Sequence, residues 1–148
     1  MGNLVRLSFT LEPELSQALD QLRERKGYGN RSEFLRDLIR AKLVEEEWAA
    51  DAEVVGTVTV VYDHHRRGLS ERLTELQHGF HDVILATTHI HLDRDICVEA
   101  VLVKGKASRV REIADRLGQP KGVLHCSLAV ATTGAALKAG AIGSQRDG

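Results

Sequence analysis

Residues 88–99 read Thr-His-Ile-His-Leu-Asp-Arg-Asp-Ile-Cys-Val-Glu, a stretch that predicts two β-strands joined by a tight turn. The middle of the stretch, Asp93-Arg94-Asp95, is polar and typical of a turn. In the first strand His89 and His91 are two residues apart, so both side chains leave the same face, about 6.6 Å apart along the chain. The sequence therefore predicts a β-hairpin whose first strand presents two imidazoles on one side.

The predicted turn also fixes which side chains face each other across the hairpin. The antiparallel pairs are Leu92 with Ile96, His91 with Cys97, and His89 with Glu99. Antiparallel partners project to one side, so two imidazoles and one thiol converge, and the Glu99 carboxylate stands beside them as a hydrogen-bond acceptor. We expect the opposite face to pack into the core, because its members are all apolar: Ile90, Leu92, Ile96, Val98, Ala100 and Leu102.

Two imidazoles and a thiolate form a donor set for a transition metal and leave one coordination position open. Soft sulfur together with nitrogen suits Ni(II), Cu(II), Co(II) or Zn(II). A fourth nitrogen in the same plane favours square-planar Ni(II) or Cu(II), whereas tetrahedral closure favours Zn(II). The alternative is an exposed hairpin with incidental histidines and a partly buried thiol, but the alignment of Cys97 with His91 favours metal binding.

Composition limits the other possibilities. The chain has 148 residues and a formal net charge of −1, so it carries no polybasic tail and shows no attraction to a membrane surface. No apolar run is long enough to span a membrane, and the amino terminus lacks the apolar stretch of a signal peptide. The two cysteines, Cys97 and Cys126, lie in separate apolar contexts and suggest no disulfide. We therefore expect a cytoplasmic protein with reduced thiols.

Residues 4–11 alternate between apolar and polar side chains and predict a strand with one buried face. Two helices are expected next: the first begins at Pro13 and ends near Gly27, and the second begins at Asn30. One strand and two helices bury too little apolar surface to be stable alone, so we expect two copies to pair. The paired strands form a two-stranded ribbon that fits the DNA major groove. The side chains on its outer face are Arg6, Ser8 and Thr10.

The rest of the chain predicts a second domain with the element order βαββαβ. Strands are expected at 54–62, in the hairpin at 82–104 and at 123–131, with helices at 69–78 and 110–117. This is a ferredoxin-like unit in an α+β protein, with both helices on one face of an antiparallel sheet. We expect its other face, with Leu85, Val101 and Val103 beside the metal ligands, to pack on another subunit. The predicted divisions are 1–47 for the first domain, 48–53 for a linker, 54–131 for the second domain and 132–148 for a flexible tail.

A strand-helix-helix module followed by this unit resembles the nickel-responsive transcriptional regulators (the NikR family), and the first module resembles the ribbon-helix-helix repressors. The motifs that carry the resemblance are Arg6-Leu7-Ser8-Phe9-Thr10, Arg31-Ser32-Glu33, Gln77-His78 and the run from His89 through Cys97. The resemblance implies a ribbon-helix-helix domain that binds operator double-stranded DNA and an ACT-like metal-binding domain. It also implies a homotetramer built as a dimer of dimers.

The same resemblance implies roles for particular residues. One Ni(2+) per subunit is held by His89, His91 and Cys97 together with His78 from a neighbouring copy of the chain. DNA bases are read by Arg6, Ser8 and Thr10, and the DNA backbone is contacted by Asn30 and Arg36. Glu33 and Asp37 either hold a cation between the two domains or form a solvated acidic face. The implied function is a nickel-dependent repressor of nickel-uptake genes.

Other interpretations stay open at this point. Family members often continue Gln-His with more histidines, whereas here two other residues intervene before His81, which is a rival fourth ligand. His64 and His65 predict either a weak accessory metal site or solvated loop side chains. Competing functions are a ribbon-helix-helix antitoxin, a regulator of another transition metal, and an enzyme that uses the metal as a Lewis acid. Four protein ligands leave an enzyme no open coordination position.

Overall fold

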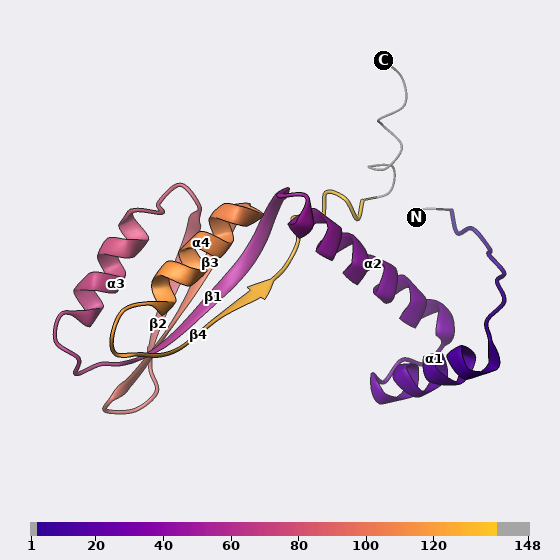
Figure 1. Ribbon diagram of the computed structural model, residues 1–148, viewed down its shortest axis with the longest axis horizontal. Helices are drawn as coiled ribbons and strands as arrows, with labels where there is room; N and C mark the ends of the chain where they lie inside the picture. Colours follow the sequence, from indigo (N-terminus) through magenta and orange to yellow (C-terminus); the bar gives the residue numbers. More distant parts are fainter. Residues whose placement is uncertain (1–2, 139–148) are drawn as a thin grey trace, which may run out of the picture. The chain divides into compact units, whose positions relative to one another are not determined.

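The computed structural model describes residues 3–138 and contains two compact units (Figure 1). One holds helix α1 and most of helix α2, and the other spans Val44–Ala135. The elements in chain order are α1 (Pro13–Arg25), α2 (Arg31–Ala49), β1 (Glu53–Asp63), α3 (Leu69–His78), β2 (Ile84–His91), β3 (Ile96–Lys106), α4 (Ala107–Gly118) and β4 (Val123–Val130). The predicted α+β class and the βαββαβ order of the second part are confirmed.

The two helices of the first unit begin and end where local chemistry requires it. Pro13 stands at the start of α1, where its missing N–H costs no hydrogen bond. The chain turns after α1 at Gly27, whose φ of 78° is accessible to glycine without strain. Asn30 caps α2, because its Oδ1 accepts the backbone N–H of Glu33 at 2.9 Å. Between the helices, the Phe34 side chain is 5% exposed and packs on the Tyr28 ring.

Residues 3–12 form no strand in the structure of the single chain, contrary to the strand expected at 4–11. The apolar side chains of this segment are open to solvent, with Val5 and Leu7 each 80% exposed and Phe9 60% exposed. The physical reason is that a β-strand needs a hydrogen-bonded neighbour, and the chain supplies none of its own for this segment. The strand expected at 4–11 therefore requires a hydrogen-bonded neighbour from outside this chain.

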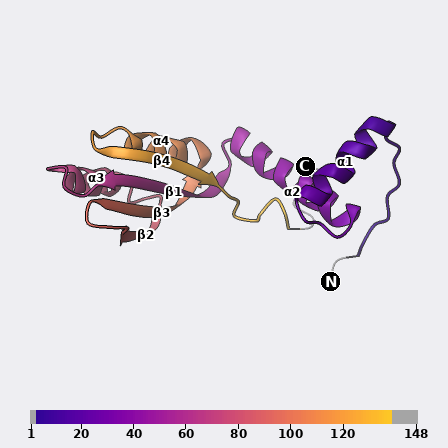
Figure 2. The ribbon, with the colours of Figure 1, turned by 90° about the horizontal axis from the view of Figure 1, so that it is seen from below.

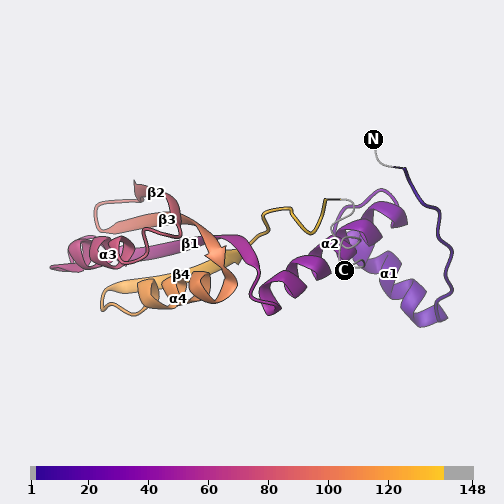
Figure 3. The ribbon, with the colours of Figure 1, turned by 90° about the horizontal axis from the view of Figure 1, so that it is seen from above.

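The second unit is a four-stranded antiparallel sheet in the order β2-β3-β1-β4, so β2 and β4 are its edges (Figures 2 and 3). Helices α3 and α4 cover one face, as expected for a ferredoxin-like unit. Their apolar stripes meet the inward side chains of the two central strands. The fully buried members of this core include Val58, Val60, Leu73, Val101, Val103, Val110, Ile113 and Leu117.

The helix-covered face of the sheet is the opposite of the one expected from the sequence. Cys97 and Val101 are fully buried on the helix side, and Glu99 between them is 7% exposed. The apolar set expected to form the core lies on the open face instead, where Ile90 is 48% and Leu92 is 62% exposed. The expectation was wrong because β3 is apolar on both faces, so its own pattern does not determine which face the helices cover.

Helix α2 continues through Ala49, so the first two residues of the linker expected at 48–53 belong to this helix. Trp48 is 4% exposed and belongs to the second unit, where its indole N–H donates to the carbonyl of Ala131 at 2.9 Å. The Arg111 guanidinium lies 5.3 Å from the centroid of the same ring. Only residues 50–52 separate the helix from β1. Most of the tail expected at 132–148 lies outside the described residues, which end at 138.

Replacement of Leu73 by alanine tests the helix-covered core. The Leu73 side chain belongs to α3 and is fully buried in the core, so Leu73→Ala leaves a cavity and should lower the free energy of unfolding by about 2–5 kcal/mol. Urea denaturation measures this change. The matched control is Leu124→Ala on β4, because Leu124 is 61% exposed and its truncation should cost less than about 1 kcal/mol. Equal losses in the two variants would contradict the assignment of the covered face.

The first turn of α4 is bound by a carboxylate from the connection before β1. The Asp51 side chain accepts the backbone N–H of Ser108 at 2.6 Å and its hydroxyl at 3.0 Å. These hydrogen bonds hold the pKa of Asp51 below its usual value of 3.8. A lowered folded pKa means that the stabilisation is present above pH 3.8 and is lost as the pH falls through the folded value.

Asp51→Asn should therefore lower the melting temperature at neutral pH, and the difference from the wild type should shrink below pH 3.8. Asparagine is the suitable replacement because Asp51 has a φ of 54°, which asparagine tolerates. Thermal denaturation of both proteins across this pH range checks the expectation. A difference that stays constant in acid would show that the charge of Asp51 contributes nothing.

Candidate metal centre

The predicted register of the hairpin is confirmed: His91 pairs with Cys97 and His89 pairs with Glu99. The turn is fixed by Asp93, whose Oδ1 accepts the backbone N–H groups of Asp95 and Ile96, each at 2.8 Å. These two donors lower the pKa of the Asp93 carboxyl. The short polar turn therefore determines which side chains meet across the strands.

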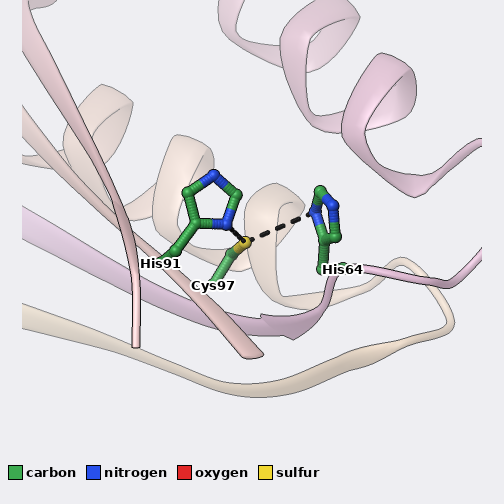
Figure 4. Close-up of side chains that lie close together, drawn as sticks. All are labelled: His64, His91 and Cys97. Carbon is green, nitrogen blue, oxygen red and sulfur yellow. Dashed lines mark hydrogen bonds between the residues drawn. The ribbon is translucent and has the colours of Figure 1, made fainter. Parts of the chain in front are cut away.

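Cys97 lies between two imidazoles (Figure 4). Its Sγ is 3.1 Å from Nδ1 of His91 and 3.5 Å from Nδ1 of His64. Within residues 3–138, these three side chains form a group whose ligand atoms lie within 4.8 Å of one another. Both histidines are exposed, whereas the cysteine is fully buried. The centre is therefore a buried thiol with an imidazole on either side.

His64 enters this group through the topology of the sheet. Tyr62, near the end of β1, pairs with Cys97 of β3, so the residues that follow β1 lie beside the hairpin. The backbone N–H of His64 donates to the carbonyl of Asp95 at 2.7 Å and ties the loop to the turn. The neighbouring His65 is placed differently, with its Nε2 3.0 Å from the Asp95 carboxylate.

His89 belongs to a hydrogen-bonded group beside the sulfur. Its Nδ1 is 3.3 Å from both the Glu99 carboxylate and the Tyr62 hydroxyl. The second oxygen of Glu99 accepts an N–H of Gln77 at 2.7 Å, and the Gln77 carbonyl accepts the Thr87 hydroxyl at 2.9 Å. With Nδ1 occupied by these partners, Nε2 of His89 is the nitrogen left to bind a metal.

In the absence of a cation, the surroundings of the centre favour the neutral forms of the Cys97 thiol and the Tyr62 phenol, because the pKa of each is raised. Burial raises the pKa of the Cys97 thiol, and the negative charges of Glu99 and Asp93 raise it further. Burial, with the nearby Glu99 carboxylate and Cys97, raises the pKa of Tyr62 to about 12. A divalent cation at the sulfur would reverse the balance at Cys97, because metal coordination deprotonates a thiol. The donor set of sulfur and imidazole nitrogen fits a transition metal.

Three candidate ligands lie outside the group of His64, His91 and Cys97 within one chain: His89, which faces Glu99 and Tyr62, and the two histidines His78 and His81. His78 is exposed at the last residue of α3, and His81 is exposed just beyond it. Nδ1 of His81 is 3.2 Å from the backbone carbonyl of His78. The imidazole of His78 is therefore exposed and takes no part in the group around Cys97 of its own chain.

The residues expected to contact DNA or a cation lie in the first unit. Arg6, Ser8 and Thr10 are exposed on the segment that precedes α1, and Arg36 is exposed on α2. The carbonyl oxygen of Asn30 is engaged in capping α2. Asp37 already accepts the Tyr28 hydroxyl at 2.7 Å and an N–H of Arg40 at 2.6 Å, whereas Glu33 is exposed.

Two family profiles match the chain. Residues 55–131 match the NikR C terminal nickel binding domain, which covers the sheet and the centre around Cys97. Residues 5–46 match the ribbon-helix-helix protein, copG family. The chain belongs to the NikR family of nickel-responsive regulators. The resemblance inferred from the sequence motifs is thereby confirmed.

Relatives of this regulator match nearly end to end. A nickel-responsive regulator of Geobacter sulfurreducens is 51% identical over 90% of this chain and 97% of its own length. One from Solibacter usitatus is 49% identical over 93% of this chain and its whole length. A solved structure of an uncharacterized Thermotoga maritima protein matches at 19% identity and a TM-score of 0.48, over 53% of this chain and 96% of that one. Among the described residues of this regulator, no helix is both long and apolar enough to cross a membrane.

Substitution of the buried thiol tests the centre. Since sulfur binds a metal as thiolate, Cys97→Ser should abolish the near-ultraviolet sulfur-to-nickel charge-transfer band of the nickel-loaded protein. Absorption spectra during titration with nickel measure the band. The matched control is Cys126→Ser, which should keep it, because Cys126 lies elsewhere and its thiol donates to the carbonyl of Ala114. If Cys126→Ser loses the band and Cys97→Ser keeps it, the sulfur ligand is Cys126 and the assignment of Cys97 is wrong.

Proposed function

We propose that this chain is a nickel-dependent transcriptional regulator that represses nickel-uptake genes by binding their operator DNA when nickel is present. The observation that carries the proposal is the register of β2 and β3, which brings His91 to 3.1 Å from Cys97 inside the region that matches the nickel-binding domain. We assign DNA binding to residues 1–47 and metal binding to residues 54–131, in agreement with the extents of the two family matches.

We propose that each subunit holds one Ni(2+) through His89, His91 and Cys97, with His78 supplied by a neighbouring subunit. The common face of the first three residues and the free Nε2 of His89 support the set from one chain. The exposure of His78 leaves it available to another copy. Three nitrogens and one sulfur suit square-planar Ni(II), and bound nickel would then link two subunits. Glu99 orients the His89 ring through its Nδ1.

Two separate apolar surfaces support a homotetramer built as a dimer of dimers. The first lies in the first unit and includes Leu7, Phe9 and Ile39, each at least 60% exposed. The second is the open face of the sheet, where Leu85 is 57% and Leu92 is 62% exposed. Exposed apolar patches of this kind are typical of interfaces. One surface would pair two ribbon-helix-helix units, and the other would join metal-binding units.

In the proposed dimer, the segments 4–11 of two copies pair as a ribbon and place Arg6, Ser8 and Thr10 in the DNA major groove. The amino-terminal turn of α2, with Asn30 and Arg36, would contact the DNA backbone. The proposed cation at Glu33 and Asp37 would have to compete with Arg40 for the Asp37 carboxylate, since the two groups already form an ion pair. We propose a non-enzymatic role at DNA in the cytoplasm, supported by relatives that are named as regulators and by the ribbon-helix-helix match.

A DNA-binding assay on the chain's own upstream region tests the function. The full-length protein should bind this DNA tightly with nickel and weakly without it, and Cys97→Ser should bind weakly in both conditions. Fluorescence anisotropy at fixed salt measures both affinities, because salt alone changes protein–DNA affinity strongly. Equal binding with and without nickel would overturn the proposal.

The same assay tests the proposed base contact of Arg6. Arg6→Ala should weaken operator binding by about 1–3 kcal/mol and relax the preference at one position of each half-site, because arginine reads guanine through two hydrogen bonds. Arg25→Ala is the control, since Arg25 ends α1 rather than lying on the proposed ribbon. A uniform loss across all DNA sequences would show that Arg6 contacts only phosphate.

A further inference from the structure

We propose that a cavity between helices α3 and α4 binds a small organic phosphate. The two helices lie side by side on the covered face of the sheet, and the cavity between them has a volume of about 210 Å³ (Figure 1). Its lining consists of two arginines, one glutamine and two apolar residues: Arg72, Leu76, Arg116, Gln119 and Pro120. None of these residues belongs to the metal centre, so the cavity is a separate site.

The cavity concentrates positive charge. Arg72 of α3 and Arg116 of α4 line it together, and no carboxylate is part of its lining. Two guanidinium groups at one small cavity repel each other unless an anion lies between them. A guanidinium donates two parallel N–H groups to a phosphate, whose monoester carries a charge of about −1.5 to −2 at neutral pH. The two arginines therefore match a phosphate monoester in charge and in hydrogen bonding.

The polar groups of the cavity are available to a ligand. Among residues 3–138, the Arg116 guanidinium and the side-chain amide of Gln119 form no hydrogen bond and no ion pair. Arg72 has one ion-pair partner, Glu75 at 3.8 Å, and both side chains are more than half exposed. An exposed pair of this kind contributes little to stability. A phosphate would therefore displace no strong contact within the chain.

A neighbouring cavity between the same helices has the opposite arrangement. Its arginine is Arg109, which donates to the Glu112 carboxylate at 3.0 Å and to the Asp82 carboxylate at 3.3 Å. The Arg109 guanidinium also lies 4.1 Å from the centroid of the Phe80 ring. These contacts balance its charge within the chain. The first cavity lacks such partners, so it is the one of the two that fits an anion.

The apolar part of the lining favours a phosphate carried on an organic group over inorganic phosphate. Leu76 packs against the core and Pro120 is half-buried, so together they offer an apolar wall to the body of the ligand. A ligand held by residues of both helices joins α3 to α4. Helix α3 ends at His78, so the phosphate site is linked to nickel binding in as far as the proposed function of His78 holds.

Binding of phenyl phosphate to the full-length protein tests the site. Isothermal titration calorimetry without nickel, at an ionic strength kept constant with sodium chloride, should show saturable binding of one molecule per chain. Arg72→Gln and Arg116→Gln should each weaken this binding by about tenfold, because each removes one charge-assisted partner of the phosphate. The matched control Arg25→Gln removes the same charge from the other unit and should stay within about twofold of the wild type.

Three outcomes of the titrations would overturn the inference. The first is a wild-type protein that shows no saturable binding of phenyl phosphate. The second is an equal weakening in all three variants, which would show a general effect of net charge. The third is an Arg116→Gln protein that keeps its affinity for phenyl phosphate but binds duplex DNA of unrelated sequence more weakly, which would assign the arginine to the DNA backbone instead.

Hydrogen exchange tests whether the ligand joins the two helices. Phenyl phosphate should slow the exchange of the amides of residues 69–78 in the wild type and leave them unchanged in Arg116→Gln. Unchanged exchange in the wild type would contradict the joining of α3 to α4. Both measurements are made without nickel, so they decide the phosphate site whether or not the protein binds DNA in response to nickel.

Discussion

The antiparallel pairing of β2 with β3 is the constraint on which the metal centre depends. The side-chain period of a strand is two, so a slip of one residue would turn His91 away from Cys97 and break the donor set. The register is held by a turn in which a single carboxylate, that of Asp93, satisfies two backbone donors. The hydrogen bonds of the turn therefore fix the register that places the Cys97 sulfur beside the His91 imidazole.

The order of elements and the hairpin register followed from sequence, because both depend on local periodicity and turn chemistry. The covered face of the sheet did not, since β3 is apolar on both sides. The missing signal lay in β1, where Thr57 and Thr59 alternate with buried valines. Thr57 pairs with Leu102 and Thr59 with Ala100, so the two threonines mark the open face of β3 as well. Neighbouring strands have to be read together to decide such a case.

The local sequence pattern also did not predict that His64 lies at the centre, because a histidine in a polar loop is usually solvated. The topology supplies what the pattern lacks: β1 lies beside β3, so the residue two beyond Tyr62 reaches the neighbourhood of Cys97. The strand expected at 4–11 is absent from the structure for the opposite reason. A strand needs a hydrogen-bonded neighbour, and the described part of this chain supplies none for the segment, so local alternation alone does not make it a strand.

The buried Glu99 carboxylate has a consequence for how this domain changes over evolutionary time. Its partners come from three other elements: Tyr62 from β1, Gln77 from α3 and His89 from β2. Loss of one donor leaves a buried charge short of a hydrogen bond, so the effect of each substitution depends on the residues at the other positions. Substitutions at these four positions should therefore covary among related sequences. A related protein in which only one of the four residues is replaced is expected to have a lower free energy of unfolding. A second, compensating substitution should restore it.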